Sequence, residues 1–221
     1  MKAFIREYSC NSWPNLFVYT FAIKDRAMKY DIDAFNHLIK NRRSVYPNQF
    51  QPGKQIPAAI IENILENATW APNHSQTEPW HFTVFSGEGR KTLAVFQSEL
   101  YKSESGEKFK EEKYLKLQKQ PLLASHVLAI GMKRSMEKKI PEIEEIAAVA
   151  CAVQNIYLST TVYGLGGYWT TGGITYYQNA KSFFGLDKDD KLLGFFYLGY
   201  VSILSPPSTR KSIDEKVTWV E

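Results

Sequence analysis

Three residues near position 42 are well suited to hold a phosphate. Arg42, Arg43 and Ser44 follow an amphipathic stretch and therefore fall at the end of a predicted helix. Two guanidinium groups beside a hydroxyl can donate several charge-assisted hydrogen bonds to one phosphate. Basic side chains at a helix C-terminus also interact favourably with the helix dipole when no ligand is bound. Alone, the triplet is therefore weak evidence for a site.

A second segment, between positions 70 and 80, combines small, amide and aromatic residues between two prolines and leads into a predicted strand. Such a loop offers donors and acceptors to a flat heterocycle but no catalytic base. Its polar and turn-forming residues include Pro72, Asn73, His74 and Gln76, which by themselves predict an ordinary loop. His74 has no second histidine, cysteine or carboxylate at ligand spacing, so no metal site is predicted.

A third segment, Trp169, Thr170, Thr171, Gly172 and Gly173, follows a long apolar stretch. It lacks the Gly-Lys-Ser/Thr ending of a phosphate-binding P-loop, and the chain also lacks the glycine fingerprint of dinucleotide-binding folds. By itself, this pattern predicts a tight exit from a strand.

Periodicity predicts the elements that position these segments. Asp33 can cap a helix that ends near Arg42, and Pro57 opens a second helix whose apolar residues face the core. Alternating or continuous apolar runs predict strands at 80–85, 127–130 and 192–200. A short helix is predicted around 182–184, ending at Gly185. Helices and strands that alternate irregularly favour an α+β fold.

The longest predicted helix, 142–163, is apolar on most sides, so it is expected to be a central pillar or part of a subunit interface. Cys151, within it, is expected to be buried. The stretch 90–120 alternates lysines and glutamates, which predicts a solvated helical excursion at the surface.

The 221 residues predict an N-terminal extension of uncertain order at 1–30, where 17–21 could form a strand, and one domain at 31–221 with an extended tail after Pro206 and Pro207. A net charge of +4 without a block of like charge does not indicate nucleic-acid binding. No apolar run is long enough to span a membrane, and no signal peptide is recognisable. Two cysteines, Cys10 and Cys151, without a disulfide framework favour the cytoplasm.

Taken together and in this order, the three segments resemble the nitroreductase family over about positions 31–211. The resemblance implies an α+β nitroreductase-like fold, with a central, mostly antiparallel sheet flanked by helices, in an intertwined homodimer. It also implies FMN at the dimer interface and NADH or NADPH as hydride donor.

The resemblance also assigns roles by position. Arg42 and Ser44 would hold the FMN phosphate and ribityl hydroxyls, and Arg43 would lie near the pyrimidine edge or the phosphate. Trp70 to His74, and Gln76, would come from the partner chain and contact the ring. Trp169, Thr170 and Thr171 would line the ring, while Gly172 and Gly173 allow close approach. Arg210 or Lys211 would close on the phosphate.

The implied function is transfer of a hydride from NAD(P)H through flavin to an acceptor such as a nitroaromatic or a quinone, with the chemistry at flavin N5 and no catalytic side chain. A specialised flavin-destroying, dehalogenating or azoline-oxidising relative is a second reading. A flavin-binding or flavin-sensing protein with little turnover is the alternative function. It follows from Thr170 and Thr171, which stand where relatives often carry Arg-Ser.

Overall fold

The computed structural model describes residues 30–221, so the predicted strand at 17–21 and Cys10 lie outside the described residues. Residues 30–37 belong to a first unit, and Leu38–Glu221 form a second, compact unit. The boundary falls inside helix α2 (Ile32–Asn41), whose end confirms the prediction. Asp31 caps α2 in place of the predicted Asp33, because its Oδ1 accepts the backbone N–H groups of Asp33 and Ala34 at 2.9 and 3.0 Å.

The second unit is built on a four-stranded antiparallel sheet in the order β1-β2-β4-β3. The predicted strands are confirmed as β1 (Trp80–Ser86), β2 (His126–Met132) and β4 (Lys191–Tyr200). Strand β3 (Leu165–Thr170) includes Gly166 and Gly167. A Cβ on Gly167 would lie 2.6 Å from the Phe196 ring, so the glycine lets this ring pack against β3.

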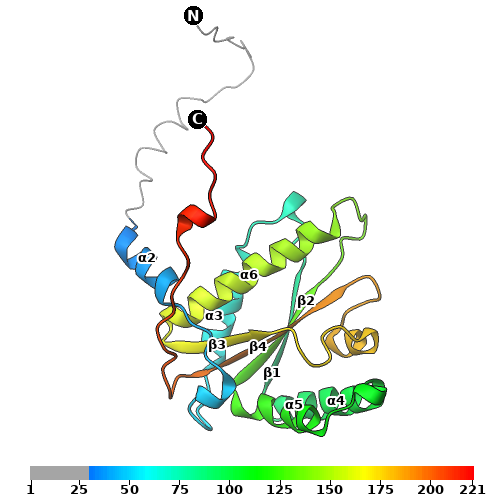
Figure 1. The fold of residues 1–221 in the computed structure, drawn as a ribbon. Helices are drawn as coiled ribbons and strands as arrows, with labels where there is room; N and C mark the ends of the chain where they lie inside the picture. The colour runs from blue at the N-terminus through cyan, green and yellow to red at the C-terminus, as the bar shows by residue number, and fades with distance from the viewer. Residues whose placement is uncertain (1–29) are drawn as a thin grey trace, which may run out of the picture. The chain divides into compact units, whose positions relative to one another are not determined.

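Helices cover both faces of the sheet, as Figure 1 shows. Helices α3 (Ala58–Thr69) and α6 (Glu142–Val162) pack on one face. Helices α4 (Gly89–Glu104) and α5 (Glu111–Leu123), with the 3-10 helix η4 (Gln178–Phe184), pack on the other. Every residue of β2 is buried, because this central strand is covered on both sides. The predicted α+β class is confirmed.

Helices α4 and α5, joined through the short η3 (Gly106–Lys108), correct the prediction of a surface excursion. Leu93, Tyr101 and Leu117 are buried in the core. The Tyr101 hydroxyl also donates to the Lys108 carbonyl at 3.2 Å and accepts the Lys110 N–H at 3.0 Å. Each helix packs one apolar side on the sheet while its charged residues stay outside, so the overall polarity of the stretch was misleading.

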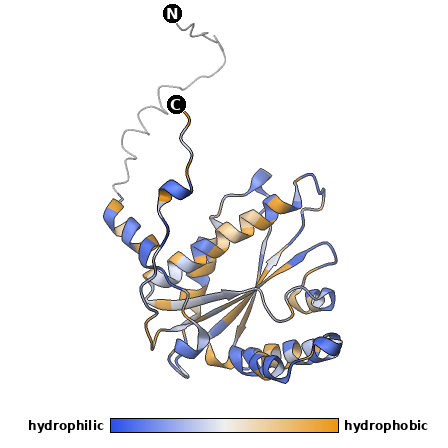
Figure 2. Ribbon diagram, in the orientation of Figure 1, coloured by the Kyte–Doolittle hydropathy of each residue, from blue (hydrophilic) through white to orange (hydrophobic). Residues whose placement is uncertain are grey.

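Helix α6 confirms the longest predicted helix, but Cys151 is exposed, which corrects its predicted burial. The sheet and α3 cover only one side of α6, where Val149, Ala152 and Ile156 are buried. Ile143 and Val162 on its other side are each 69% exposed. Apolar colours extend along α6 in Figure 2. One flank of this apolar helix therefore has no packing partner among residues 30–221.

After β4 the chain runs to Glu221 with one short 3-10 helix, η5 (Ile213–Glu215). Leu204 and Trp219 in this tail are exposed. Among residues 30–221, none of the helices combines the length and apolar character that a membrane crossing requires.

Candidate functional site

Tyr157 of α6 brings the first and third predicted segments together. The Arg42 guanidinium carbon lies 4.7 Å from the centre of the Tyr157 ring, and Ser44 Oγ lies 3.4 Å from the Tyr157 hydroxyl. The same hydroxyl accepts the backbone N–H of Trp169 at 2.8 Å. Ser44 also forms a β-bridge with Gly167, so Arg42 and Ser44 are anchored at the free edge of β3.

The sequence analysis missed Tyr157 because it lies in an apolar run and resembles a core residue. The available signal was its hydroxyl, since a buried tyrosine usually requires a hydrogen-bond partner.

The two arginines of the first segment differ in their contacts. Arg43 Nη1 donates to the carbonyls of Lys40 and Arg42 at 2.6 and 2.9 Å, so it closes the end of α2. Arg42 stacks on Tyr157 and forms no ion pair with any residue between 30 and 221. A half-buried cation beside a hydroxyl, with no carboxylate partner in the described part of the chain, suits a phosphate.

The third segment divides between the two faces of the sheet. The Trp169 indole packs with the α6 side and donates to the Leu193 carbonyl at 3.0 Å. Thr170, Gly172 and Gly173 line a cavity of about 230 Å³ on the α5 side. Gly173 has a φ of +70°, and a Cβ there would lie 3.0 Å from Leu117 Cδ2, so both conformation and space favour glycine. Thr171 is exposed.

The second segment forms a strained loop around the 3-10 helix η2 (His74–Gln76). Ser75, Gln76 and Glu78 have φ angles of 53°, 53° and 44°, in the left-handed region that non-glycine residues rarely adopt. His74 Nδ1 lies 2.6 Å from Glu144 Oε2 at the start of α6, and Asn73 Oδ1 accepts the Glu78 N–H at 3.0 Å. Around them, Pro72 is exposed and Trp70 is 81% exposed.

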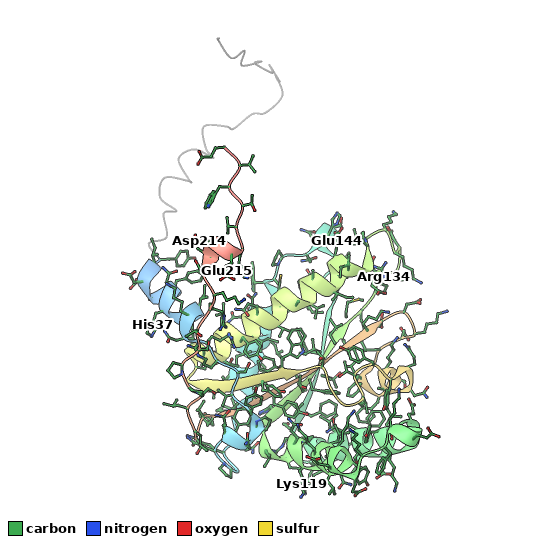
Figure 3. All side chains as sticks on the ribbon, in the orientation of Figure 1. His37, Lys119, Arg134, Glu144, Asp214 and Glu215 are labelled. Carbon is green, nitrogen blue, oxygen red and sulfur yellow. The ribbon has the colours of Figure 1, made fainter. Side chains whose placement is uncertain are left out.

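Within one chain, this loop does not meet the other two segments. It is tied to Glu144 near one end of α6, labelled in Figure 3, whereas Arg42 and Ser44 contact Tyr157 toward the other end. At ~1.5 Å of rise per residue, Glu144 and Tyr157 are about 20 Å apart along the helix. The three segments therefore do not converge on one point within a single chain.

The basic residues of the tail are held by local contacts. Arg210 Nη1 donates to Ser208 Oγ at 2.8 Å and to the Thr209 carbonyl at 2.9 Å. Lys211 Nζ lies 3.7 Å from Glu215. The tail starts beside the site, since Ser205 Oγ donates to the Ser44 carbonyl at 3.0 Å. The structure does not bring Arg210 or Lys211 to Arg42.

The donor set fits FMN. Arg42 and Ser44 offer a cation and a hydroxyl to a phosphate, and Gly172 and Gly173 after β3 carry no side chain of their own. Among residues 30–221, no three His, Cys, Asp or Glu side chains gather as metal ligands. The arrangement therefore suits an organic phosphate that carries a flat ring.

Comparison with known proteins supports this interpretation. Residues 39–200 match the nitroreductase family. YdjA of Escherichia coli (strain K12), a candidate NAD(P)H nitroreductase, is 31% identical over 140 residues, which make up 63% of this chain and 74% of YdjA. A nitroreductase-like family protein from Bacillus cereus is 30% identical, with a TM-score of 0.70 over 88% of this chain and 98% of its own. The fold is shared with a nitroreductase with bound FMN from Bacteroides fragilis NCTC 9343, which is 23% identical, with a TM-score of 0.62 over 84% and 98% of the chains.

Proposed function

The chain belongs to the nitroreductase family of oxidoreductases, and on this premise we propose that it is an FMN-dependent enzyme that oxidises NADH or NADPH and reduces a nitroaromatic or quinone acceptor. The observation that carries the proposal is the junction at Tyr157. There Arg42 and Ser44 lie at the edge of the strand that leads into Thr170 and Gly172. The Tyr157 hydroxyl thus connects the proposed phosphate-binding residues with the loop that is proposed to line the flavin ring.

The chain's own residues would bind and orient the cofactor. Arg42 and Ser44 would hold the phosphate, where each charge-assisted hydrogen bond contributes roughly 1.5–3 kcal/mol. A few such contacts supply a good part of the ~8 kcal/mol that micromolar binding requires. Gly172 and Gly173 would let the ring approach the backbone. Bound FMN would supply the two-electron carrier, and no acid–base pair of side chains is needed for that chemistry.

We propose further that the site is shared between two copies of the chain. The exposed apolar flank of α6 gives a surface for a partner, because ordinary monomers rarely leave so much apolar area uncovered. The segment from Trp70 to Gln76 would then contact the flavin bound at Arg42 and Ser44 of the other copy. The separation along α6 supports this arrangement.

The overall reaction balances without a further reagent. NADH or NADPH gives up a hydride and becomes the oxidised nicotinamide. A nitro group takes up the two electrons and two protons, one of them from water, and becomes a nitroso group with release of one water. The proposal places this activity in the cytoplasm, in keeping with the low cysteine count.

The visible absorption spectrum of the purified protein tests the proposal. It is recorded anaerobically, after reconstitution with FMN if necessary, while NADPH and then NADH are added. We expect a flavin band that bleaches promptly with at least one donor. A band that persists would favour the flavin-binding protein with little turnover, and no band after reconstitution would refute the FMN assignment.

Two further measurements resolve the finer parts of the proposal. Light scattering of the FMN-loaded protein should give the mass of a dimer, and a monomer that still holds FMN would refute the shared site. Product analysis after turnover separates acceptor reduction from the flavin-destroying, dehalogenating or azoline-oxidising reactions.

A further inference from the structure

Two adjoining cavities form a groove along α5. The inner cavity, of about 230 Å³, reaches Thr170 and Gly173, and the outer one, of about 470 Å³, lies between α5 and the 3-10 helix η1 (Pro47–Gln49). Lys116, Gln120 and Tyr168 line both, so we treat the two cavities as one feature, the α5 groove. In the proposed enzyme, its inner end meets the loop that lines the flavin ring.

The charged residues that line the α5 groove are all lysines, so their charge is positive. Lys113, Lys116 and Lys119 follow one another at three-residue intervals on α5, and no aspartate or glutamate among residues 30–221 lines either cavity. Lys116 and Lys119, the latter labelled in Figure 3, form no ion pair with the residues that the structure describes. Lysines on the wall of a concave site with no counter-charge attract an anion.

The rest of the wall suits an aromatic ring. Tyr46 and Tyr168 present rings whose centres are 4.6 Å apart at 47°, and Phe195 and Tyr197 line the inner end. Burial raises the pKa of Tyr197, so its phenol stays protonated and adds no negative charge. A ring that carries an anionic group matches an aromatic wall beside a row of lysines.

We propose that the α5 groove binds the electron acceptor and selects aromatic acceptors that carry a carboxylate or a similar anionic group, with Lys116 and Lys119 as the residues that set this preference. The selection among acceptors rests on the proposed function. The binding of an aromatic anion in the groove does not, and it can be measured without turnover.

The experiment compares two acceptors of nearly the same shape, 4-nitrobenzoate and the neutral 4-nitrobenzamide. For the FMN-loaded wild-type protein, we expect a higher kcat/KM with the benzoate. In the double variant Lys116→Ala/Lys119→Ala, the ratio of the two kcat/KM values should fall about tenfold, since two charge-assisted contacts are lost. Lys110→Ala is the matched control, because this exposed lysine precedes the same helix and its side chain lines neither cavity. Its ratio should equal that of wild type.

Other outcomes overturn the proposal. An unchanged ratio of the two kcat/KM values in the double variant would show that the lysines do not discriminate acceptors by charge. A rise in the KM for NADH or NADPH that is equal with both acceptors would assign the lysines to the donor's phosphates. Weaker binding of FMN but not of riboflavin would assign them to the cofactor's phosphate.

A calorimetric titration separates this proposal from the proposed function. 4-Nitrobenzoate should bind the wild-type protein at least about tenfold more tightly than 4-nitrobenzamide, and the double variant should lose this difference. If the protein fails to hold or reduce FMN but shows this difference, the proposed function is wrong and the anion site stands. If flavin chemistry is intact but the titration shows no difference, the anion site is refuted.

Discussion

The hydroxyl of Tyr157 accepts a 2.8 Å hydrogen bond from the backbone N–H of Trp169. This contact fixes β3 against α6 just before the chain enters the ring-lining loop. The ring of the same tyrosine lies under the guanidinium of Arg42. One side chain therefore sets the relative positions of the proposed phosphate and ring contacts, and it can be tested without touching either group.

Tyr157→Phe should lower both stability and FMN affinity. The variant keeps the ring under Arg42 but removes the acceptor for the partly buried Trp169 N–H, and an unpaired donor costs up to about 1–3 kcal/mol. Urea unfolding of the protein without flavin measures this loss. Tyr163→Phe, at the exposed end of α6, is the control and should change stability by less than ~0.5 kcal/mol. Equal effects of the two changes would contradict the assigned role.

Arg42 and Arg43 should respond differently to replacement by alanine. Arg42→Ala should raise the Kd for FMN by about 10- to 100-fold, because it removes a charge-assisted grip on the phosphate. Riboflavin, which has no phosphate, should bind wild type and variant alike. Arg43→Ala should affect mainly helix stability, since its guanidinium donates to the carbonyls of Lys40 and Arg42. Flavin titration by fluorescence measures both ligands, and a larger FMN effect at Arg43 would reverse the assignment.

The sequence was a good guide wherever structure depends on neighbouring residues. Strands β1, β2 and β4 and helix α6 were predicted because alternation and helical periodicity are local signals. The buried side of α5 was missed because its charged residues dominate the pattern while Leu117 packs underneath.

Contacts between distant parts of the chain, and surfaces left for another subunit, could not be predicted from the sequence. The Tyr157 hydroxyl contacts Ser44, which is 113 positions away in the sequence, and no local sequence pattern indicates that contact. Cys151 was predicted to be buried because an apolar helix does not reveal how much of its surface its own chain covers. The residues of the three segments were recognisable as polar or glycine-rich. Which segments meet within one chain became clear only when α6 was seen to separate His74 from Arg42.

His126 should make the folded protein less stable in mild acid. Burial, and secondarily the charge of Arg90, lowers its pKa from the usual 6.5. Ser125 Oγ accepts the Ile56 N–H at 2.7 Å and lies 2.9 Å from His126 Nδ1, so it can donate its proton to the neutral ring. Because the unfolded chain binds the proton more readily, this stability is complete above pH 6.5 and is lost as pH falls toward the lowered pKa.

Urea unfolding across this pH window checks the contribution of His126. The wild-type free energy of unfolding should fall more steeply with acid than that of His126→Asn, which cannot titrate there. Parallel curves for the two proteins would show that His126 is not the group responsible.

Ala147→Glu tests whether the uncovered flank of α6 is the partner surface of the proposed dimer. Ala147 is exposed in the single chain, so a glutamate there costs the isolated fold little. At a dimer interface, the same change would bury an unpaired charge and cost several kcal/mol for each copy. We expect a monomer by light scattering. FMN affinity should also fall, because the segment around His74 would no longer reach a neighbouring site.

Val95→Glu is the control. It places the same charge at a 59% exposed apolar position on α4, which packs on the opposite face of the sheet, and it should leave a dimer that retains FMN. A dimeric Ala147→Glu protein that holds FMN as tightly as wild type would show that the two copies do not meet along α6.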